Sequence, residues 1–163
     1  MRYFDPRALA SGECDPGKFG RGPASVRVAG SLGAYGGALP YHILTAALSA
    51  LDASEAVTGI RLEVDSGGGD VAGAHEAHMA VAAMTTPLTV VVTGRCFSAA
   101  YWVFSAASKL LASPVAAVGQ IGAQCLPSKP PSSVHVFTSA GSAAKNDPEG
   151  YPEQYQAFVD ETA

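Results

Sequence analysis

The sequence predicts an α/β fold in which repeated β-strand, α-helix, β-strand units form a mostly parallel sheet. Segments with strand character alternate along the chain with helical segments of ten or more residues, which is typical of parallel crossovers. Hydrophobic residues make up 48% of the chain and charged residues only 15%, so a packed core is favoured over disorder. A length of 163 residues is sufficient for one domain with a full hydrophobic core.

The first half of the chain predicts an arm followed by strand, helix and strand. Residues 1–23 contain three prolines and several glycines, which predicts an irregular N-terminal arm before a single domain over 24–163. Alternating β-branched residues predict the first strand, and Pro40 suits the first position of the helix that follows. The elements expected here are a strand over 24–29, a glycine-rich turn over 30–37, a helix over 40–53 and a strand over 58–64.

The second half continues the alternation. The run Leu88–Thr93 is continuously apolar, as in a strand that is covered on both faces. Pro87 ends the preceding helical pattern. The elements expected here are a helix over 71–84, a strand over 88–93, a tight connection over 94–97, a helix over 98–107, short strands over 109–112 and 116–118, a loop over 127–133, a strand over 134–138 and a helix over 152–162.

Several classes of partner and site are disfavoured by composition. A net charge of −4 argues against nucleic acid, which requires clustered Lys and Arg. No apolar run reaches the roughly 18 residues that span a bilayer, and residues 1–22 lack the apolar segment of a signal peptide. Three scattered cysteines form neither a disulfide framework nor a CxxC metal site, and His75 and His78 lack the spacing of a zinc helix. We therefore expect a reducing cytoplasm and no bound metal.

A glycine-rich loop, Asp65–Asp70, follows the second predicted strand. Its three consecutive glycines allow the main chain to approach a ligand, and its amides could bind an oxyanion. A phosphate site is disfavoured, because the loop lacks the phosphate-binding motifs and Asp70 would repel phosphate. A plain tight turn remains the alternative.

Ser98 lies where the third predicted strand meets a helix of small residues. A serine at this place is usually an N-cap that accepts a backbone hydrogen bond. It could instead be a nucleophile whose oxyanion is stabilised by the amides at the helix N-terminus. Cys96, two residues earlier, fits a buried small hydrophobic residue better than a nucleophile.

Four ordered motifs carry a resemblance to a known family. They are Asp65-Ser66-Gly67-Gly68-Gly69, Cys96-Phe97-Ser98-Ala99-Ala100-Tyr101, Ala106-Ala107-Ser108-Lys109-Leu110 and Gly119-Gln120-Ile121-Gly122-Ala123. Over about residues 25–163 the chain resembles the signal peptide peptidase A family of serine peptidases, and within it the phage head-maturation proteases. The resemblance implies a ClpP/crotonase-like fold.

The resemblance also implies a Ser–Lys dyad. Ser98 would be the nucleophile, and Lys145, in the turn Ala140–Asp147, would be the base that takes its proton. A neutral, desolvated amine is needed for this role, because serine is a weak nucleophile at neutral pH. The remaining implied site residues are Gly68 and Ala99 in the oxyanion hole, and Gly69 and Tyr101 against the substrate. Gly67 stands where the family has proline, and one extra residue precedes Lys145.

The function implied is a serine endopeptidase that cleaves extended peptide segments without a cofactor and processes phage capsid or scaffold protein. The family further implies a homo-oligomer in the host cytoplasm or a virion precursor, and relatives that continue through further C-terminal helices. Two alternatives stay open: an inactive assembly module of the same fold, and a crotonase-type acyl-CoA enzyme. For the latter, Glu76 and Asp70 are the candidate carboxylates after the glycine loop.

Overall fold

The computed structural model describes residues 1–34, 36–125 and 137–138. The chain divides into two compact units, Met1–Gly119 (the N-terminal unit) and Gln120–Ala163 (the C-terminal unit). In the C-terminal unit, β9 (Gln124–Cys125) pairs antiparallel with β10 (Phe137–Thr138), at the end of the strand expected over 134–138. The predicted loop over 127–133 and helix over 152–162 lie outside the described residues.

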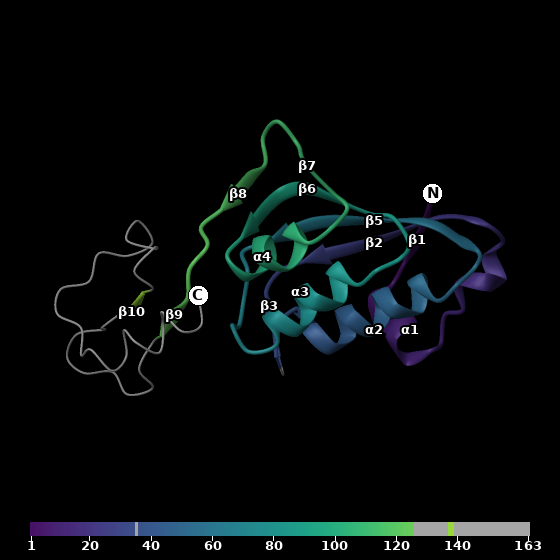
Figure 1. Cartoon of the computed structure of the whole chain (residues 1–163), viewed down its shortest axis with the longest axis horizontal. Helices are drawn as coiled ribbons and strands as arrows, with labels where there is room; N and C mark the ends of the chain where they lie inside the picture. Colours follow the sequence, from purple (N-terminus) through teal and green to yellow (C-terminus); the bar gives the residue numbers. More distant parts are fainter. Residues whose placement is uncertain (35, 126–136, 139–163) are drawn as a thin grey trace. The chain divides into compact units, whose positions relative to one another are not determined.

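A six-stranded parallel sheet forms the centre of the N-terminal unit (Figure 1). The strand order is β1-β2-β5-β6-β7, and β8 pairs with β6 further along that strand. A pair of two-residue strands, β3 and β4, is separate from this sheet. The bounds are β1 (Arg2–Phe4), β2 (Gly22–Ala29), β3 (Leu32–Gly33), β4 (Leu39–Pro40), β5 (Val57–Ser66), β6 (Leu88–Phe97), β7 (Lys109–Ala112) and β8 (Ala117–Gly119).

Four helices cover the sheet: α1 (Pro6–Ser11), α2 (Tyr41–Asp52), α3 (Ala74–Ala82) and α4 (Ala99–Ser105). Each helix contacts the next, and α1, α2 and α3 lie along one face of the strands in Figure 1. The connections from β2 to β5, β6 and β7 all step in the same direction across the sheet. Right-handed crossovers that step in one direction place their helices on one face, so the predicted mostly parallel α/β architecture is confirmed.

The core lies between this helix layer and the sheet. Leu44 and Leu51 of α2 and Leu62 and Val64 of β5 are completely buried. Along β6, however, fully buried residues alternate with half-buried ones from Leu88 to Val92. The prediction of a strand covered on both faces was therefore wrong for the described part of the chain. The apolar run reflects β-branched strand residues on both faces, of which one is tightly packed.

The expected irregular arm over 1–23 contains regular structure. β1 pairs in parallel with β2, α1 follows it, and a 3₁₀ helix covers Pro16–Phe19. Proline starts both helical segments here: each follows an aspartate whose carboxylate accepts a backbone N–H two residues later, Asp5 from Arg7 and Asp15 from Gly17. The prolines thus act as helix-initiating residues and not as breakers.

In the N-terminal unit, two element boundaries differ from the predictions by three or more residues. α3 begins at Ala74 instead of residue 71, because Gly73 precedes it in the left-handed conformation with φ +87°. β6 continues to Phe97, so the tight connection expected over 94–97 is strand. Within the described segments, no helix is both long enough and apolar enough to cross a bilayer.

Candidate active site

Ser98 occupies a strained turn between strand β6 and helix α4. Its φ of 52° and ψ of −129° lie outside the regions that L-residues normally adopt. The Ser98 side chain makes no N-cap hydrogen bond to α4, although the residue holds the N-cap position. A serine on a strained strand-to-helix turn is the arrangement of the nucleophile elbow in serine hydrolases. The geometry therefore favours the nucleophile over the capping interpretation.

The main chain of Ser98 is held on both sides. Its N–H donates to the carbonyl of Gly119 at the end of β8 (2.8 Å), and its carbonyl accepts from the N–H of Trp102 in α4 (3.0 Å). These bonds continue the β6–β8 pairing on one side and begin the helix on the other. Several surrounding contacts thus fix the strained conformation, as such backbone strain requires.

A bulge in β6 sets the position of this turn. Between the pairs Val64–Val92 and Ser66–Cys96, the single residue Asp65 of β5 faces three residues of β6. The Asp65 carboxylate fills the gap, accepting from the N–H of Arg95 (3.0 Å) and from its Nε (3.3 Å). These hydrogen bonds from Arg95 hold the pKa of Asp65 below its usual value. Bulges of this kind redirect the end of a strand beside functional sites.

The glycine-rich loop approaches the Ser98 turn at Gly68. A Cβ on Gly68 would lie 2.7 Å from the carbonyl oxygen of Phe97, 2.8 Å from Ser98 Cβ and 3.2 Å from the nitrogen of Ala99. Its φ of +96° also favours glycine. The two predicted halves of the site, the loop and the serine, therefore meet through the backbone at Gly68.

The two amides proposed for an oxyanion hole, those of Gly68 and Ala99, differ in their hydrogen bonding. The Gly68 N–H donates to Oγ of the fully buried Ser66 (3.2 Å), a partner that the sequence motif did not reveal. The Ala99 N–H is the first of helix α4, a position that has no partner within its own helix. Binding of an oxyanion by the Gly68 amide would therefore require that amide to exchange its bond to Ser66.

Gly69 pairs with the short strand β3. Leu32 donates its N–H to the carbonyl of Gly68 (2.9 Å) and accepts the N–H of Asp70 (3.1 Å), which makes a parallel bridge to Gly69. A Cβ on Gly69 would overlap the backbone of Leu32, so glycine is required by this close approach. Neither bond uses the N–H or C=O of Gly69 itself.

The other predicted site residues are placed as follows. Tyr101 lies three residues after Ser98 on α4 and is half-buried against the core. Lys145 lies outside the described residues, so the structure does not place the predicted base. Cys96 is completely buried, and burial raises the pKa of its thiol to about 11. It remains a neutral, packed side chain, as predicted.

Two histidines of α3, His75 and His78, contact helix α4 at Trp102. Nδ1 of His78 lies 2.8 Å from the carbonyl oxygen of Trp102, and the two rings stack at 5.8 Å. The ring of His75 lies 6.0 Å from that of Trp102. The spacing of residues in the sequence did not predict this contact between α3 and α4. Among described residues, no group of three or more His, Cys, Asp or Glu could hold a metal ion.

Comparison with known proteins agrees with this fold. The sequence profile of the family described as Clp protease matches residues 40–118, just under half of the chain and including the glycine-rich loop and Ser98. No curated protein sequence matches the chain.

Two of the solved structures that are similar to it illustrate the likeness. One is a member of the enoyl-CoA hydratase/isomerase family, with 18% identity and a TM-score of 0.51, covering 58% of this chain and 45% of that structure. The other is a ClpP1 variant from Listeria monocytogenes, with 21% identity and a TM-score of 0.40, covering 50% of this chain and 46% of that structure. The chain spans less than half the length of each. Together, the parallel sheet, the Clp protease family match and the likeness to the enoyl-CoA hydratase/isomerase structure show that the chain has a ClpP/crotonase-like α/β fold.

Proposed function

We propose that this protein is a serine peptidase with Ser98 as its nucleophile. The observation that carries the proposal is the strained turn at Ser98, held by β8 and α4 and backed by the main chain of Gly68. Backbone strain of this kind costs about 1–3 kcal/mol and is concentrated at functional sites. The match of residues 40–118 to the Clp protease family supports the same reading.

The proposed reaction is acyl transfer through Ser98. Oγ attacks the scissile carbonyl carbon while a base takes its proton, and the carbonyl oxygen becomes an oxyanion near the amides of Gly68 and Ala99. Collapse of this intermediate breaks the C–N bond, and the proton passes to the leaving amine. Water then hydrolyses the acyl-enzyme and restores the Ser98 hydroxyl.

We assign the base to Lys145 on the strength of its sequence motif. Its amine must be neutral near pH 7 to accept the serine proton, which requires a pKa well below the ordinary value of about 10.4. Lys145→Ala and Lys145→Arg should then both lose nearly all the activity that Ser98→Ala loses, because a guanidinium stays protonated. Lys109→Ala, at an exposed position of β7, is the matched control. Wild-type turnover by Lys145→Ala would mean that another residue is the base.

The proposed substrate is an extended peptide that pairs with the main chain at Gly69. The N–H and C=O of Gly69 are not used in the bridge to Leu32, and they are the groups that an added strand would bond. Resemblance to the phage head-maturation proteases further supports processing of capsid or scaffold protein, by a homo-oligomer in the host cytoplasm or a virion precursor. Light scattering that shows only monomer at high concentration would contradict the oligomer.

Labelling with a fluorophosphonate tests the nucleophile directly. We expect a single adduct that peptide mass spectrometry places on Ser98, with none on Ser98→Ala and an undiminished adduct on Ser105→Ala. The similarity to an enoyl-CoA hydratase/isomerase shows the fold alone and does not favour acyl-CoA chemistry. If the folded protein takes up no label, the inactive assembly module is the better explanation.

A further inference from the structure

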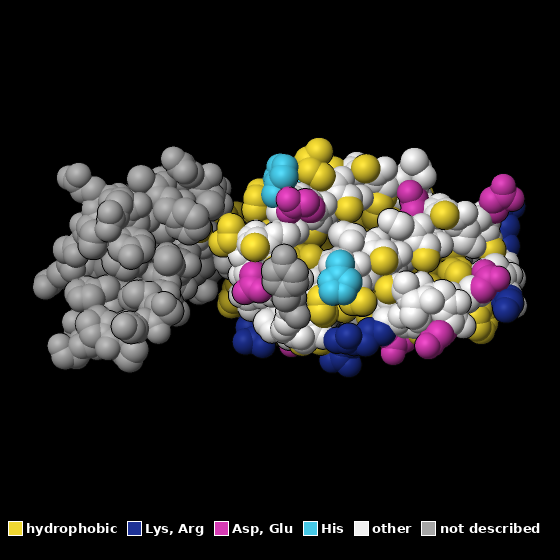
Figure 2. Space-filling model, turned by 90° about the horizontal axis from the view of Figure 1, so that it is seen from below, with side chains coloured by type: hydrophobic (Ala, Val, Ile, Leu, Met, Phe, Trp, Pro, Cys, Tyr) yellow, Lys and Arg dark blue, Asp and Glu magenta, His cyan; other side chains and the backbone are white. Residues whose placement is uncertain are grey.

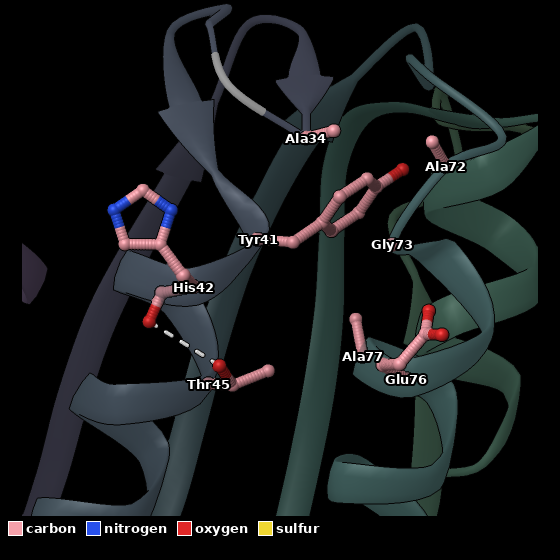
Figure 3. A pocket seen from close by; sticks show the side chains of 8 residues that line it. All are labelled: Ala34, Tyr41, His42, Thr45, Ala72, Gly73, Glu76 and Ala77. Atoms are coloured by element: carbon pink, nitrogen blue, oxygen red, sulfur yellow. Dashed lines mark hydrogen bonds between the residues drawn. The ribbon is translucent and has the colours of Figure 1, made fainter.

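A cavity of about 380 Å³ lies in the N-terminal unit between helices α2 and α3 (Figure 3). This volume falls within the roughly 300–1,000 Å³ of pockets that bind small ligands. Ala72 and Gly73, in its wall, continue directly from the loop that contacts Ser98 through Gly68. The cavity is therefore connected to the candidate active site through a few residues of main chain.

The walls of this cavity combine apolar surface with the polar side chains of His42 and Thr45 and one carboxylate. Methyl groups of Ala34, Ala72 and Ala77 and the ring of Tyr41 supply the apolar part. Figure 3 shows the Tyr41 side chain reaching from α2 toward Ala72 and Gly73, with the Glu76 carboxylate on the α3 side. The residues that line the cavity include neither lysine nor arginine, and Figure 2 shows Lys and Arg along the border of this face of the N-terminal unit.

The aromatic wall is fixed and stays uncharged. The Tyr41 hydroxyl donates to the carbonyl of Asp70 (2.8 Å), and a Cβ on Gly73 would lie 3.0 Å from the Tyr41 ring. Burial, with a smaller contribution from the charge of Asp70, raises the pKa of Tyr41 to about 12. The Asp70 carboxylate accepts the N–H of Ala34 (3.1 Å), which places a second negative charge beside the wall.

We propose that this cavity binds the side chain of a lysine or arginine residue of the peptide substrate. The aliphatic part of the side chain would pack on the alanine methyls and the Tyr41 ring, and its cation would pair with the Glu76 carboxylate. A cation also gains from the face of a neutral aromatic ring. The proposal rests on the proposed peptidase function, since it assigns a subsite next to the glycine-rich loop.

The test uses the full chain carrying Ser98→Ala, which binds peptides without cleaving them. The probes are fluorescein-labelled octapeptides of alanine with one arginine at each position in turn, and counterparts with norleucine. Fluorescence anisotropy should show, at one position, about fivefold tighter binding of the arginine peptide, the upper range for an exposed ion pair. Glu76→Gln should reduce that ratio to about one. Glu55→Gln, at an exposed carboxylate away from the cavity, should leave it unchanged.

Each other outcome overturns the proposal. If no arginine preference is found, the protein has no subsite for a cationic side chain. If the preference survives Glu76→Gln in a protein with an unchanged circular dichroism spectrum, the cation binds at another place. Glu76-dependent binding of butylguanidinium as tight as that of the peptide assigns the cavity to free small cations. The fluorophosphonate experiment is independent: an unlabelled Ser98 together with a Glu76-dependent arginine preference would refute the peptidase and leave the cation site standing.

Discussion

Replacing Ser98 by glycine should stabilise the protein relative to replacing it by alanine. The two variants both lack the hydroxyl, so their difference isolates the backbone. Alanine keeps a Cβ in the conformation with φ 52° and ψ −129°, whereas glycine adopts this conformation without steric penalty. The comparison therefore measures the strain that the fold maintains at this residue.

The expected magnitude follows from two opposing effects. Relief of the strain contributes about 1–3 kcal/mol to the free energy of unfolding. The greater conformational freedom of glycine in the unfolded chain removes about 0.5–1 kcal/mol. The net gain is about 0–2.5 kcal/mol. Each 1 kcal/mol corresponds to a rise in Tm of about 2–4 °C for a chain of this size.

Thermal and urea unfolding of the two variants provide the assay, and Ser105 supplies the matched control. Ser105 is the last residue of helix α4, where the backbone is helical. Ser105→Gly should be less stable than Ser105→Ala by about 0.5–1 kcal/mol, the opposite sign. If glycine is also the less stable replacement at Ser98, the turn is not strained and the main support for the nucleophile disappears.

Three further predictions concern the backbone contact at Gly68 and two titratable side chains, Asp52 and Tyr41, elsewhere in the N-terminal unit. Gly68→Ala should lower the free energy of unfolding in a urea titration by about 2 kcal/mol or more, since its Cβ would overlap the backbone of Phe97. Gly67→Ala is the control: nothing lies within 4 Å of its Cβ, so its effect in the same titration should be small. Burial pushes the pKa of Asp52 up, but hydrogen bonds led by the N–H of Thr86 hold it below its usual value. The stabilisation that the Asp52 carboxylate contributes is therefore present above about pH 4 and is lost as the pH falls below that value. Asp52→Ala should lower the free energy of unfolding by about 1–2 kcal/mol at pH 7 and by much less near pH 2. Because the pKa of Tyr41 is raised to about 12, wild-type stability should fall between pH 10 and 12 more steeply than that of Tyr41→Phe in parallel denaturation curves.

Local patterns predicted the elements that local chemistry determines. The alternation of apolar residues predicted the strand within β2, and the helical spacing predicted α2 to within a residue or two of its ends. The position of Ser98 between strand and helix was also predicted, because an apolar strand-forming run and an alanine-rich helix meet there. For these segments, neighbours in sequence supply most of the constraint.

Features that depend on distant partners were missed. The bulge in β6 depends on the Asp65 carboxylate of the adjacent strand, and Gly94 was its only local sign: a Cβ there would lie 2.7 Å from that carboxylate. Pairing of β1 with β2 joins segments some twenty residues apart. The contact of His78 with Trp102 likewise needs the packing of α3 on α4, which periodicity does not specify.

The conformation of Ser98 is best explained by selection for chemistry. A serine at the start of a helix can adopt an extended conformation and accept an N–H of the first turn, which contributes about 0.5–2 kcal/mol. Ser98 makes no such bond and adopts a positive φ, so the fold forgoes a cap and maintains strain at the same residue. Glycine there would avoid the strain, and the glycine at Gly68 shows that this loop contact already uses glycine where backbones approach. Departures from the locally preferred conformation that bring no stability are expected at functional positions. Here the departure occurs at the residue that carries the hydroxyl.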